Sequence, residues 1–143
     1  MKKTEVALYV RVSTKDKQEE QNQINDLTLY CEKPELTIVK VYADRMSGST
    51  SARESFQEML LDAHKKKFDM VLFWALDRFS REGVLDTLKH LSELDTAGVS
   101  YRSYNEPFIS SDGPFKELSV AFFAIMAKQE RILISERVKS GMR

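Results

Sequence analysis

Charged and hydroxyl side chains follow three apolar runs of the sequence. After residues 5–10, 36–43 and 69–75 come, in chain order, Arg11 and Ser13, then Asp44 and Arg45, then Asp77, Arg78 and Arg81. Arginine stays protonated, and its planar fork matches two phosphate oxygens at once. Fixed cations also stabilise the negative charge that spreads over a phosphoryl group during its transfer. These residue types therefore indicate a site that binds a phosphate group and acts on it.

Ser13 carries the hydroxyl that could attack such a phosphate, and the product of that attack would be a covalent phosphoester. Neither His64 nor His90 follows a predicted strand, so the sequence does not indicate a Ser-His-Asp site. The remaining way to lower the barrier is arginine charge, with Asp77 orienting guanidinium groups or moving a proton. Two structural interpretations stay open: the Arg-Asp pairs are ordinary ion pairs, and Ser13 caps the helix that follows it.

The order of the predicted elements should bring these side chains together. Apolar runs rich in strand formers predict strands over 5–10, 36–43, 69–75 and 99–104. Apolar residues at helical spacing predict helices between them: over 16–32, around 56–63, and from 84 to the stop at Gly98. This alternation predicts an α/β fold, with a mostly parallel central sheet of four to five strands and helices on both faces. Ligand groups gather at the shared carboxyl edge of such a sheet, and Arg53, which opens the second helix after the loop 46–51, is expected there too.

The last segment predicts one long helix that extends from the domain. The stretch SSDGP (110–114) is typical of a helix start, and no Gly or Pro follows before Gly141. A helix over 114–140 would be about 40 Å long at 1.5 Å per residue, so it should extend past the edge of the domain and need another partner for its far half. The alternative is two shorter helices. We therefore divide the chain into an α/β core, 1–112, and a helical segment, 113–143.

Composition narrows the class of protein. The 143 residues carry 22 Lys and Arg against 22 Asp and Glu, which argues against a surface that is basic all over. Residues 128–143 nevertheless hold five basic residues against two acidic ones. One cysteine, Cys31, cannot form an internal disulfide, and no segment is apolar for long enough to span a membrane, so we expect a cytoplasmic protein with no membrane partner.

Four motifs resemble the serine recombinase family, which comprises resolvases, invertases and serine integrases. The motifs have the order and spacing found in that family, and they are YVRVST (9–14), YADRMSGSTSAR (42–53), LDRFSR (76–81) and KQERILISERV (128–138). The resemblance covers almost the whole chain, and the third and fourth motifs look most like the larger members. It implies a resolvase-like fold and a site-specific recombinase that cleaves and rejoins double-stranded DNA.

The resemblance also implies a role for each matching residue. Ser13 matches the nucleophile, which forms a 5′-phosphoserine link and leaves a free 3′-hydroxyl. The arginines that match those around the scissile phosphate are Arg11, Arg53, Arg78 and Arg81, and Asp77 matches the aspartate of the site. Supporting positions are matched by Gln23, Ser47, Glu130 and Arg131. On the basic end of the long helix, the residues expected to contact DNA are Arg137, Lys139 and Arg143.

The family's partners are implied in the same way. Its members use no metal and no nucleotide cofactor, and they act as homodimers that pair into tetramers. They follow the long helix with a separate DNA-binding region, whereas this chain stops at Arg143; we therefore expect a truncated catalytic domain without the element that reads DNA sequence.

Two other functions fit some of the same residues. A metal-dependent phosphodiesterase or nuclease would use carboxylates near strand ends to hold Mg²⁺, and the candidates are Asp16, Asp44, Asp69 and Asp77. A non-catalytic module would use the long helix for oligomerisation or DNA docking and the arginines as a phosphate-binding patch.

Overall fold

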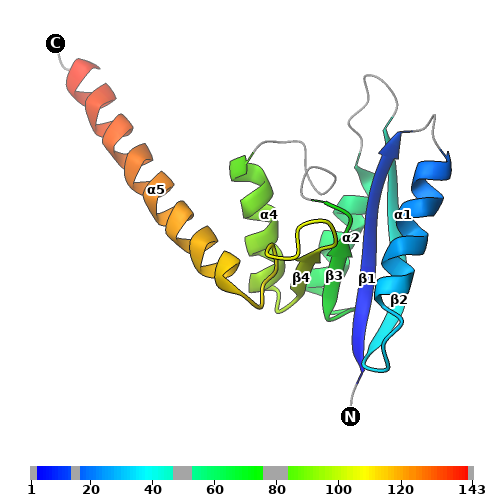
Figure 1. Ribbon diagram of the computed structural model, residues 1–143. Coiled ribbons are helices and arrows are strands. Elements are labelled where there is room, and N and C mark those ends of the chain that lie inside the picture. The colour runs from blue at the N-terminus through cyan, green and yellow to red at the C-terminus, as the bar shows by residue number, and fades with distance from the viewer. Residues whose placement is uncertain (1–2, 14–16, 47–52, 76–83, 142–143) are drawn as a thin grey trace.

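Four parallel strands form the central sheet, in the spatial order β2-β1-β3-β4. The computed structural model describes residues 3–13, 17–46, 53–75 and 84–141 (Figure 1). The strands are β1 (Thr4–Ser13), β2 (Leu36–Met46), β3 (Met70–Phe73) and β4 (Ser100–Ser103). Strand β1 pairs in parallel with β2 and with β3, and β3 pairs in parallel with β4. The predicted mostly parallel sheet is confirmed, with four strands in the described part of the chain.

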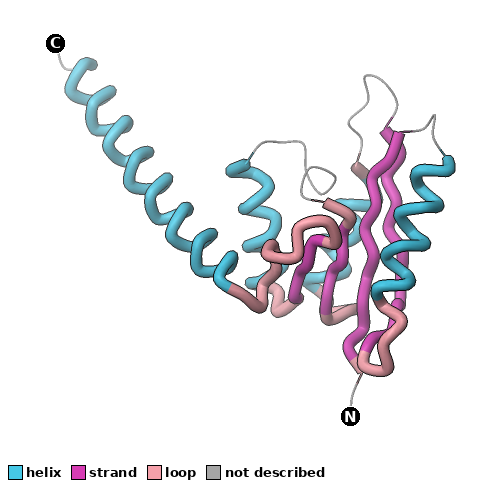
Figure 2. Tube along the Cα trace, viewed as in Figure 1, coloured by secondary structure: helices cyan, strands magenta, loops and turns pink. Residues whose placement is uncertain are grey.

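Helices cover both faces of the sheet, as Figure 2 shows by secondary structure. The helices are α1 (Lys17–Tyr30), α2 (Glu54–His64), α4 (Val84–Thr96) and α5 (Pro114–Gly141). Helix α1 packs on one face, and α2 and α4 pack on the other. This division matches the predicted α/β fold, and it places the start of α2 near the carboxyl ends of β1 and β2 (Figure 1).

Strand β1 supplies side chains to the cores on both faces. Leu8 and Val10 pack in the cluster that contains Leu27 of α1, whereas Tyr9 packs in the cluster that contains Phe56 of α2. Successive side chains of a strand point to opposite faces, so a strand covered on both sides is apolar at nearly every position. That is why residues 6–10 form an unbroken apolar run.

All four strands have other limits than the sequence predicts. Strand β1 continues past the apolar run because its backbone pairs with β2 as far as Ser13, which lies opposite Met46. Backbone pairing does not require apolar side chains. Strand β3 is shorter than the predicted strand and ends at Phe73. As a result, Arg11 lies inside β1 instead of following it.

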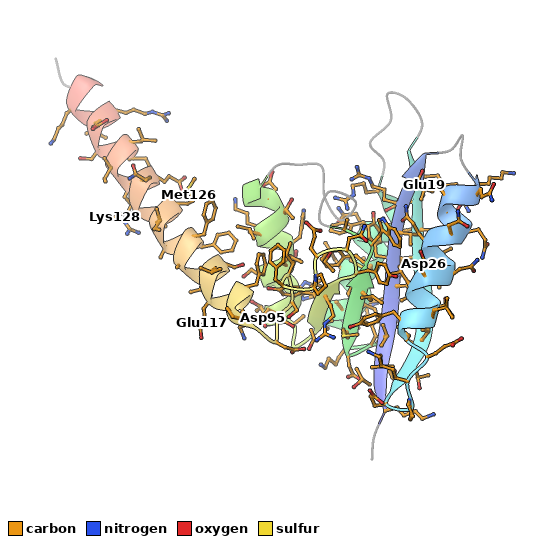
Figure 3. All side chains as sticks on the ribbon, in the orientation of Figure 1. Glu19, Asp26, Asp95, Glu117, Met126 and Lys128 are labelled. Atoms are coloured by element: carbon orange, nitrogen blue, oxygen red, sulfur yellow. The ribbon has the colours of Figure 1, made fainter. Side chains whose placement is uncertain are left out.

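Helix α5 is one continuous helix of 28 residues, about 42 Å long at 1.5 Å per residue, so the alternative of two shorter helices is wrong. It starts beside α4, where Lys116 forms an ion pair of 3.2 Å with Asp95, and it then leads away from the sheet (Figure 1). Figure 3 shows Met126 and Lys128 on the part of α5 that stands clear of the core. No helix in the described ranges has both the length and the apolar character needed to cross a bilayer.

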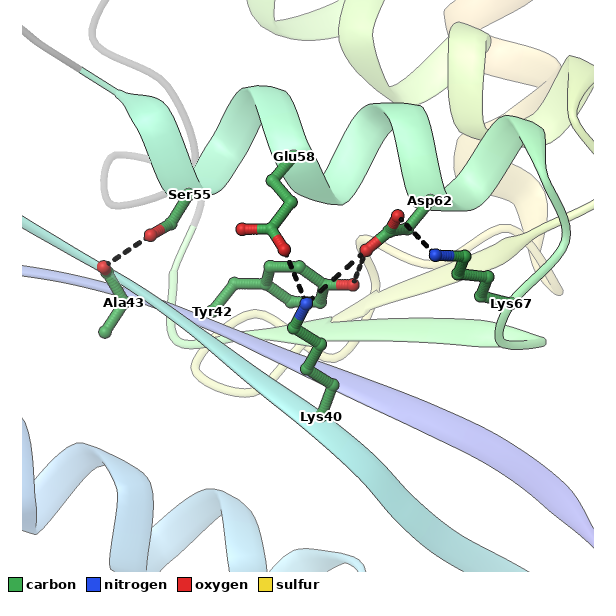
Figure 4. A network of polar contacts seen from close by, with 7 residues as sticks. All are labelled: Lys40, Tyr42, Ala43, Ser55, Glu58, Asp62 and Lys67. Carbon is green, nitrogen blue, oxygen red and sulfur yellow. Dashed lines mark hydrogen bonds and ion pairs between the residues drawn. The ribbon is translucent and has the colours of Figure 1, made fainter.

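A polar network fixes α2 against the edge strand β2 (Figure 4). The Tyr42 hydroxyl donates a hydrogen bond of 2.6 Å to Asp62, and Lys67 and Lys40 lie 3.3 Å and 3.6 Å from the same carboxylate. At the start of the helix, the Ser55 hydroxyl donates to the carbonyl oxygen of Ala43 at 2.8 Å. The hydrogen bond from Tyr42, followed by the charges of the two lysines, holds the pKa of Asp62 below its usual value of 3.8.

The substitution Asp62→Asn is expected to lower the free energy of unfolding at pH 7 by about 1.5–3 kcal/mol, the range for a hydrogen bond to a charged group. Because the folded state lowers the pKa of Asp62, the stabilisation is complete above pH 3.8 and is lost as the pH falls through the folded-state pKa. Urea unfolding at pH 7 and at pH 2.5 measures this. The difference in free energy of unfolding between the variant and the wild type should shrink at the lower pH. If that difference were the same at both pH values, the charge of the Asp62 carboxylate would not contribute to stability.

Candidate active site

The carboxyl ends of β1 and β2 lie side by side, as the site prediction requires. In the register of the two strands, Arg11 lies opposite Asp44 and Ser13 lies opposite Met46. Arg11 is only 3% exposed. Since a guanidinium group remains charged inside a protein, Arg11 is a fixed positive charge next to the end of β1. The backbone of Ser13 is described as the last residue of that strand, and its side chain lies outside what the structure describes.

Asp44 anchors the first turn of α2. Its Oδ1 accepts a hydrogen bond from the backbone N–H of Ser55 at 2.9 Å, and its Oδ2 accepts one from Phe56 at 3.0 Å. The same Oδ2 accepts a hydrogen bond of 2.8 Å from the hydroxyl of Tyr9. Free N–H groups and the positive end of the helix dipole both favour a carboxylate there. Asp44 thereby holds α2 against both long strands.

Arg53 extends from the start of α2 over β1. Its Nη2 donates a hydrogen bond of 3.3 Å to the hydroxyl of Tyr9, and its Cζ lies 3.7 Å from the ring centroid of Phe56. Tyr9 and Arg11 are two residues apart on one strand, so their side chains leave the same face, about 7 Å apart. The contact with Tyr9 therefore brings Arg53 into the neighbourhood of Arg11 on the α2 face of the sheet.

Tyr9 joins the two charged groups while remaining neutral itself. Burial raises the pKa of its hydroxyl well above the ordinary value of 10, an effect that the nearby Arg53 reduces but does not cancel. The neutral hydroxyl can donate to Asp44 and accept from Arg53 at the same time. Nothing in the sequence indicates a function for Tyr9, although its spacing of two residues from Arg11 places both on one face of a strand.

Arg45 has a different environment from Arg53. It forms a two-point ion pair with Glu20 of α1, with Nε and Nη2 at 3.0 Å and 2.8 Å from the carboxylate oxygens. The structure therefore supports the interpretation of Arg45 as part of a structural ion pair. Arg45 ties the end of β2 to α1, so it is not part of the group that faces α2.

Gln23 lies on the α1 side of the sheet. It is 3% exposed, and its Nε2 donates a hydrogen bond of 3.1 Å to Glu19. In the described part of the chain its Oε1 has no hydrogen-bond partner. The residue lines a polar depression of about 540 Å³ together with Trp74, which follows β3. Gln23 and Arg53 therefore approach the carboxyl edge from opposite faces of the sheet.

The remaining predicted site residues fall into two groups. Outside the described residues lie Ser47, Asp77, Arg78, Arg81 and Arg143, and their roles stay predictions. On the exposed outer part of α5 lie Glu130, Arg131, Arg137 and Lys139. Figure 1 shows this part of α5 on the far side of α4 from β1 and β2, so within one chain these residues lie away from Arg11 and Arg53.

His90 of α4 lies against the core. Its ring is partly buried and packs edge-on against the ring of Phe56, with centroids 5.0 Å apart and planes at 80°. The other histidine, His64, is exposed and lies 2.9 Å from Glu93. Helical spacing alone could not place His90, because its contact comes from a different helix.

Two aspartates of the metal-site alternative lie at opposite ends of the sheet. Asp44 is near the carboxyl end of β2, and both of its oxygens accept hydrogen bonds from the protein. Asp69 directly precedes β3 at the amino end, where it accepts the backbone N–H of Glu5 at 2.9 Å. These two carboxylates cannot share one cation, and no three His, Cys, Asp or Glu side chains of the described ranges form a metal-holding group.

The profile of the family described as "Resolvase, N terminal domain" matches residues 6–143. The chain belongs to this family. Among curated resolvase relatives, the probable DNA-invertase y4cG of Sinorhizobium fredii is 32% identical over 94% of this chain and 40% of its own length. The transposon Tn3 resolvase of Escherichia coli is 31% identical over 71% of this chain and 53% of its own length. The chain thus spans about half, or less, of these resolvase-family proteins.

Solved structures in the resolvase family share the fold. The N-terminal catalytic domain of TP901-1 integrase is 31% identical, with a TM-score of 0.69, over 90% of this chain and 98% of that one. A resolvase family site-specific recombinase from Streptococcus pneumoniae is 25% identical, also with a TM-score of 0.69, over 97% of this chain and 95% of that one. The expected resolvase-like fold, including the long C-terminal helix, is confirmed.

Proposed function

We propose that this chain is the catalytic domain of a site-specific DNA recombinase, with Ser13 as the nucleophile. The observation that carries the proposal is the contact of Arg53 with Tyr9, which lies two residues before Arg11 on the same face of β1. Two fixed guanidinium groups at this place suit a phosphate of the DNA backbone. Membership of the resolvase family supports the recombinase activity, since its relatives include a DNA-invertase and resolvases.

The proposed reaction is a reversible exchange of phosphoesters. The Ser13 oxygen attacks the phosphorus of a DNA phosphodiester, the bond from phosphorus to O3′ breaks, and the serine proton is passed on so that a 3′-hydroxyl is released. The 5′-phosphate remains on Ser13 as an ester. One phosphoester is made for each one broken, so attack by a 3′-hydroxyl on the phosphoserine can rejoin DNA without a nucleotide cofactor.

Arg11 and Arg53 would stabilise the charge of the transition state. Both are set before the DNA arrives: Arg11 by burial within β1, and Arg53 by Tyr9 and Phe56. Preorganised cations need no rearrangement as negative charge develops on the phosphoryl oxygens. Arg78 and Arg81 are proposed to complete the set, with Asp77 orienting them or moving the proton.

A covalent capture experiment tests this proposal without knowledge of the DNA target. The chain is incubated with random-sequence duplex DNA in the presence of EDTA, the reaction is stopped with SDS, and DNA attached to protein is recovered and sequenced. The proposal predicts attached DNA in EDTA. Cleavage that EDTA abolishes would favour the metal-dependent alternative, and binding without attachment would favour the non-catalytic module.

Assembly through α5 is part of the proposal. Large apolar side chains of the helix are exposed, among them Leu118, Val120, Ile125 and Leu133. At its base, next to α4, lies an apolar groove of about 460 Å³ that Leu118 and Phe122 help to line. Exposed apolar surface of this extent is typical of an interaction site. We propose that a second copy covers it to form a homodimer, that two dimers pair into a tetramer, and that the basic outer end of α5 lies along DNA.

The substitution Leu118→Asp is expected to raise the dimer dissociation constant at least tenfold, because burial of a leucine side chain contributes about 1.5–3 kcal/mol. Leu61→Asp on α2 is the matched control, since the two leucines are 66% and 62% exposed. Sedimentation velocity over a concentration series measures the dimer dissociation constant of each variant. Equal effects of the two substitutions, or a monomeric wild type at every concentration, would contradict assembly through α5.

A further inference from the structure

We propose that Phe56 is a positioning residue that holds the guanidinium group of Arg53 on the face of its ring. The Cζ atom of Arg53 lies 3.7 Å from the ring centroid, well within the range in which an aromatic face attracts a cation. The significance of this contact for catalysis rests on the proposed function, in which Arg53 binds the scissile phosphate. The contact between Arg53 and Phe56 does not depend on the proposed function.

The plane of the Phe56 ring is fixed by two neighbouring rings. Tyr9 of β1 meets it at 5.3 Å and 67°, and His90 of α4 meets it at 5.0 Å and 80°. Both are edge-to-face arrangements, the geometry that aromatic quadrupoles favour. Phe56 is fully buried, and its backbone N–H is bound by Asp44. Contacts from β1, β2 and α4 therefore hold in place the Phe56 ring against which Arg53 packs.

A ring positions an arginine without using the groups that bind phosphate. An aromatic face attracts the guanidinium through its π-system and accepts none of the in-plane N–H donors, whereas a carboxylate would occupy two of them and offset the charge. The hydroxyl of Tyr9 adds one neutral contact at 3.3 Å. Phe56 and Tyr9 together restrict where the cation can lie while its positive charge is kept. An aliphatic side chain at position 56 would fill the core but would not attract the guanidinium in this way.

The first test compares Phe56→Leu with Phe68→Leu. Phe68 is a matched control because it is buried in the same core cluster and meets Tyr42 edge-on at 6.0 Å, but it lies just before β3, at the amino end of the sheet. Both substitutions should destabilise the fold by similar amounts. In the wild type, the ring current of Phe56 should shift the side-chain NMR signals of Arg53 upfield. We expect Phe56→Leu to abolish that shift and Phe68→Leu to preserve it. An Arg53 shift that survives Phe56→Leu would overturn the placement.

The second test measures the rate of covalent DNA attachment well below the melting temperature of each variant. We expect Phe56→Leu to slow attachment about tenfold, the scale of one partly desolvated cation–π contact, and Phe68→Leu to slow it less than twofold. In an Arg53→Ala background, Phe56→Leu should cause no further loss. Equal rates for the two leucine variants, or a full additional loss in the Arg53→Ala background, would overturn the inference. A wild type that forms no attached DNA would overturn the proposed function instead, and the NMR shift would then decide the role of Phe56.

Discussion

Replacing Ser13 with alanine is expected to abolish the covalent protein–DNA product. No other group in the proposed reaction can form the phosphoester, so the product should fall below detection instead of being reduced. Loss of one neutral hydroxyl should change the free energy of unfolding by only about 1 kcal/mol or less. SDS gels of the captured complexes, together with urea unfolding of the same preparations, separate the two effects.

Ser13→Cys is the variant to compare with Ser13→Ala, because its thiol keeps a nucleophile at the same position. DNA binding should survive in the alanine variant, since the arginines remain, and an electrophoretic mobility shift assay checks this. Covalent product that persists in Ser13→Ala would contradict the assignment of the nucleophile. Loss of both binding and folding would show that the hydroxyl has a structural role, as in the helix-cap interpretation.

Replacing Arg53 with alanine is expected to slow DNA cleavage by about 10²- to 10³-fold, the usual cost of removing one preorganised group that stabilises transition-state charge. Its contacts with Tyr9 and Phe56 place it on the face of β1 that also carries Arg11. The rate of covalent attachment in a single turnover is the measurement, because it excludes later rejoining steps.

Arg45→Ala provides the matched control for this variant. Arg45 has the same charge and stands at the end of β2, but its guanidinium is paired with Glu20 of α1. Its removal should change the cleavage rate less than threefold and should cost less than about 1 kcal/mol of stability, because the ion pair is exposed. Similar losses of rate in both variants would mean that general positive charge at this edge, and not the placement of Arg53, determines the rate.

The sequence was sufficient to predict the fold because its local patterns agree with the overall architecture. Apolar runs bounded by polar turns mark strands buried on both faces, and the stretch after Ser110 has a start signal followed by no helix breaker until Gly141. The strand limits were harder to predict. Strand β1 continues through Arg11 because a neighbouring strand supplies hydrogen-bond partners, and that information is not local.

The candidate site could be predicted in residue types and in position along the chain, but not in its contacts. The sequence left Asp44 open to an ion pair or a metal site, and only the fold shows that it binds Tyr9, 35 positions away, and the amides of α2. The contacts of Arg53 with Tyr9, and of Phe56 with His90, likewise join elements that helical or strand periodicity treats separately. Pairwise contacts across elements are what local patterns leave undetermined.

Mapping the peptide that remains attached to captured DNA identifies the nucleophile. After protease and nuclease digestion, mass spectrometry identifies the linked residue, and extension by a template-independent polymerase detects free 3′-hydroxyl ends. We expect a single 5′-phosphate ester on Ser13 and a 3′-hydroxyl that can be extended. Attachment to any other residue, a link through a 3′-phosphate, or DNA that is cut with no peptide attached would contradict this expectation.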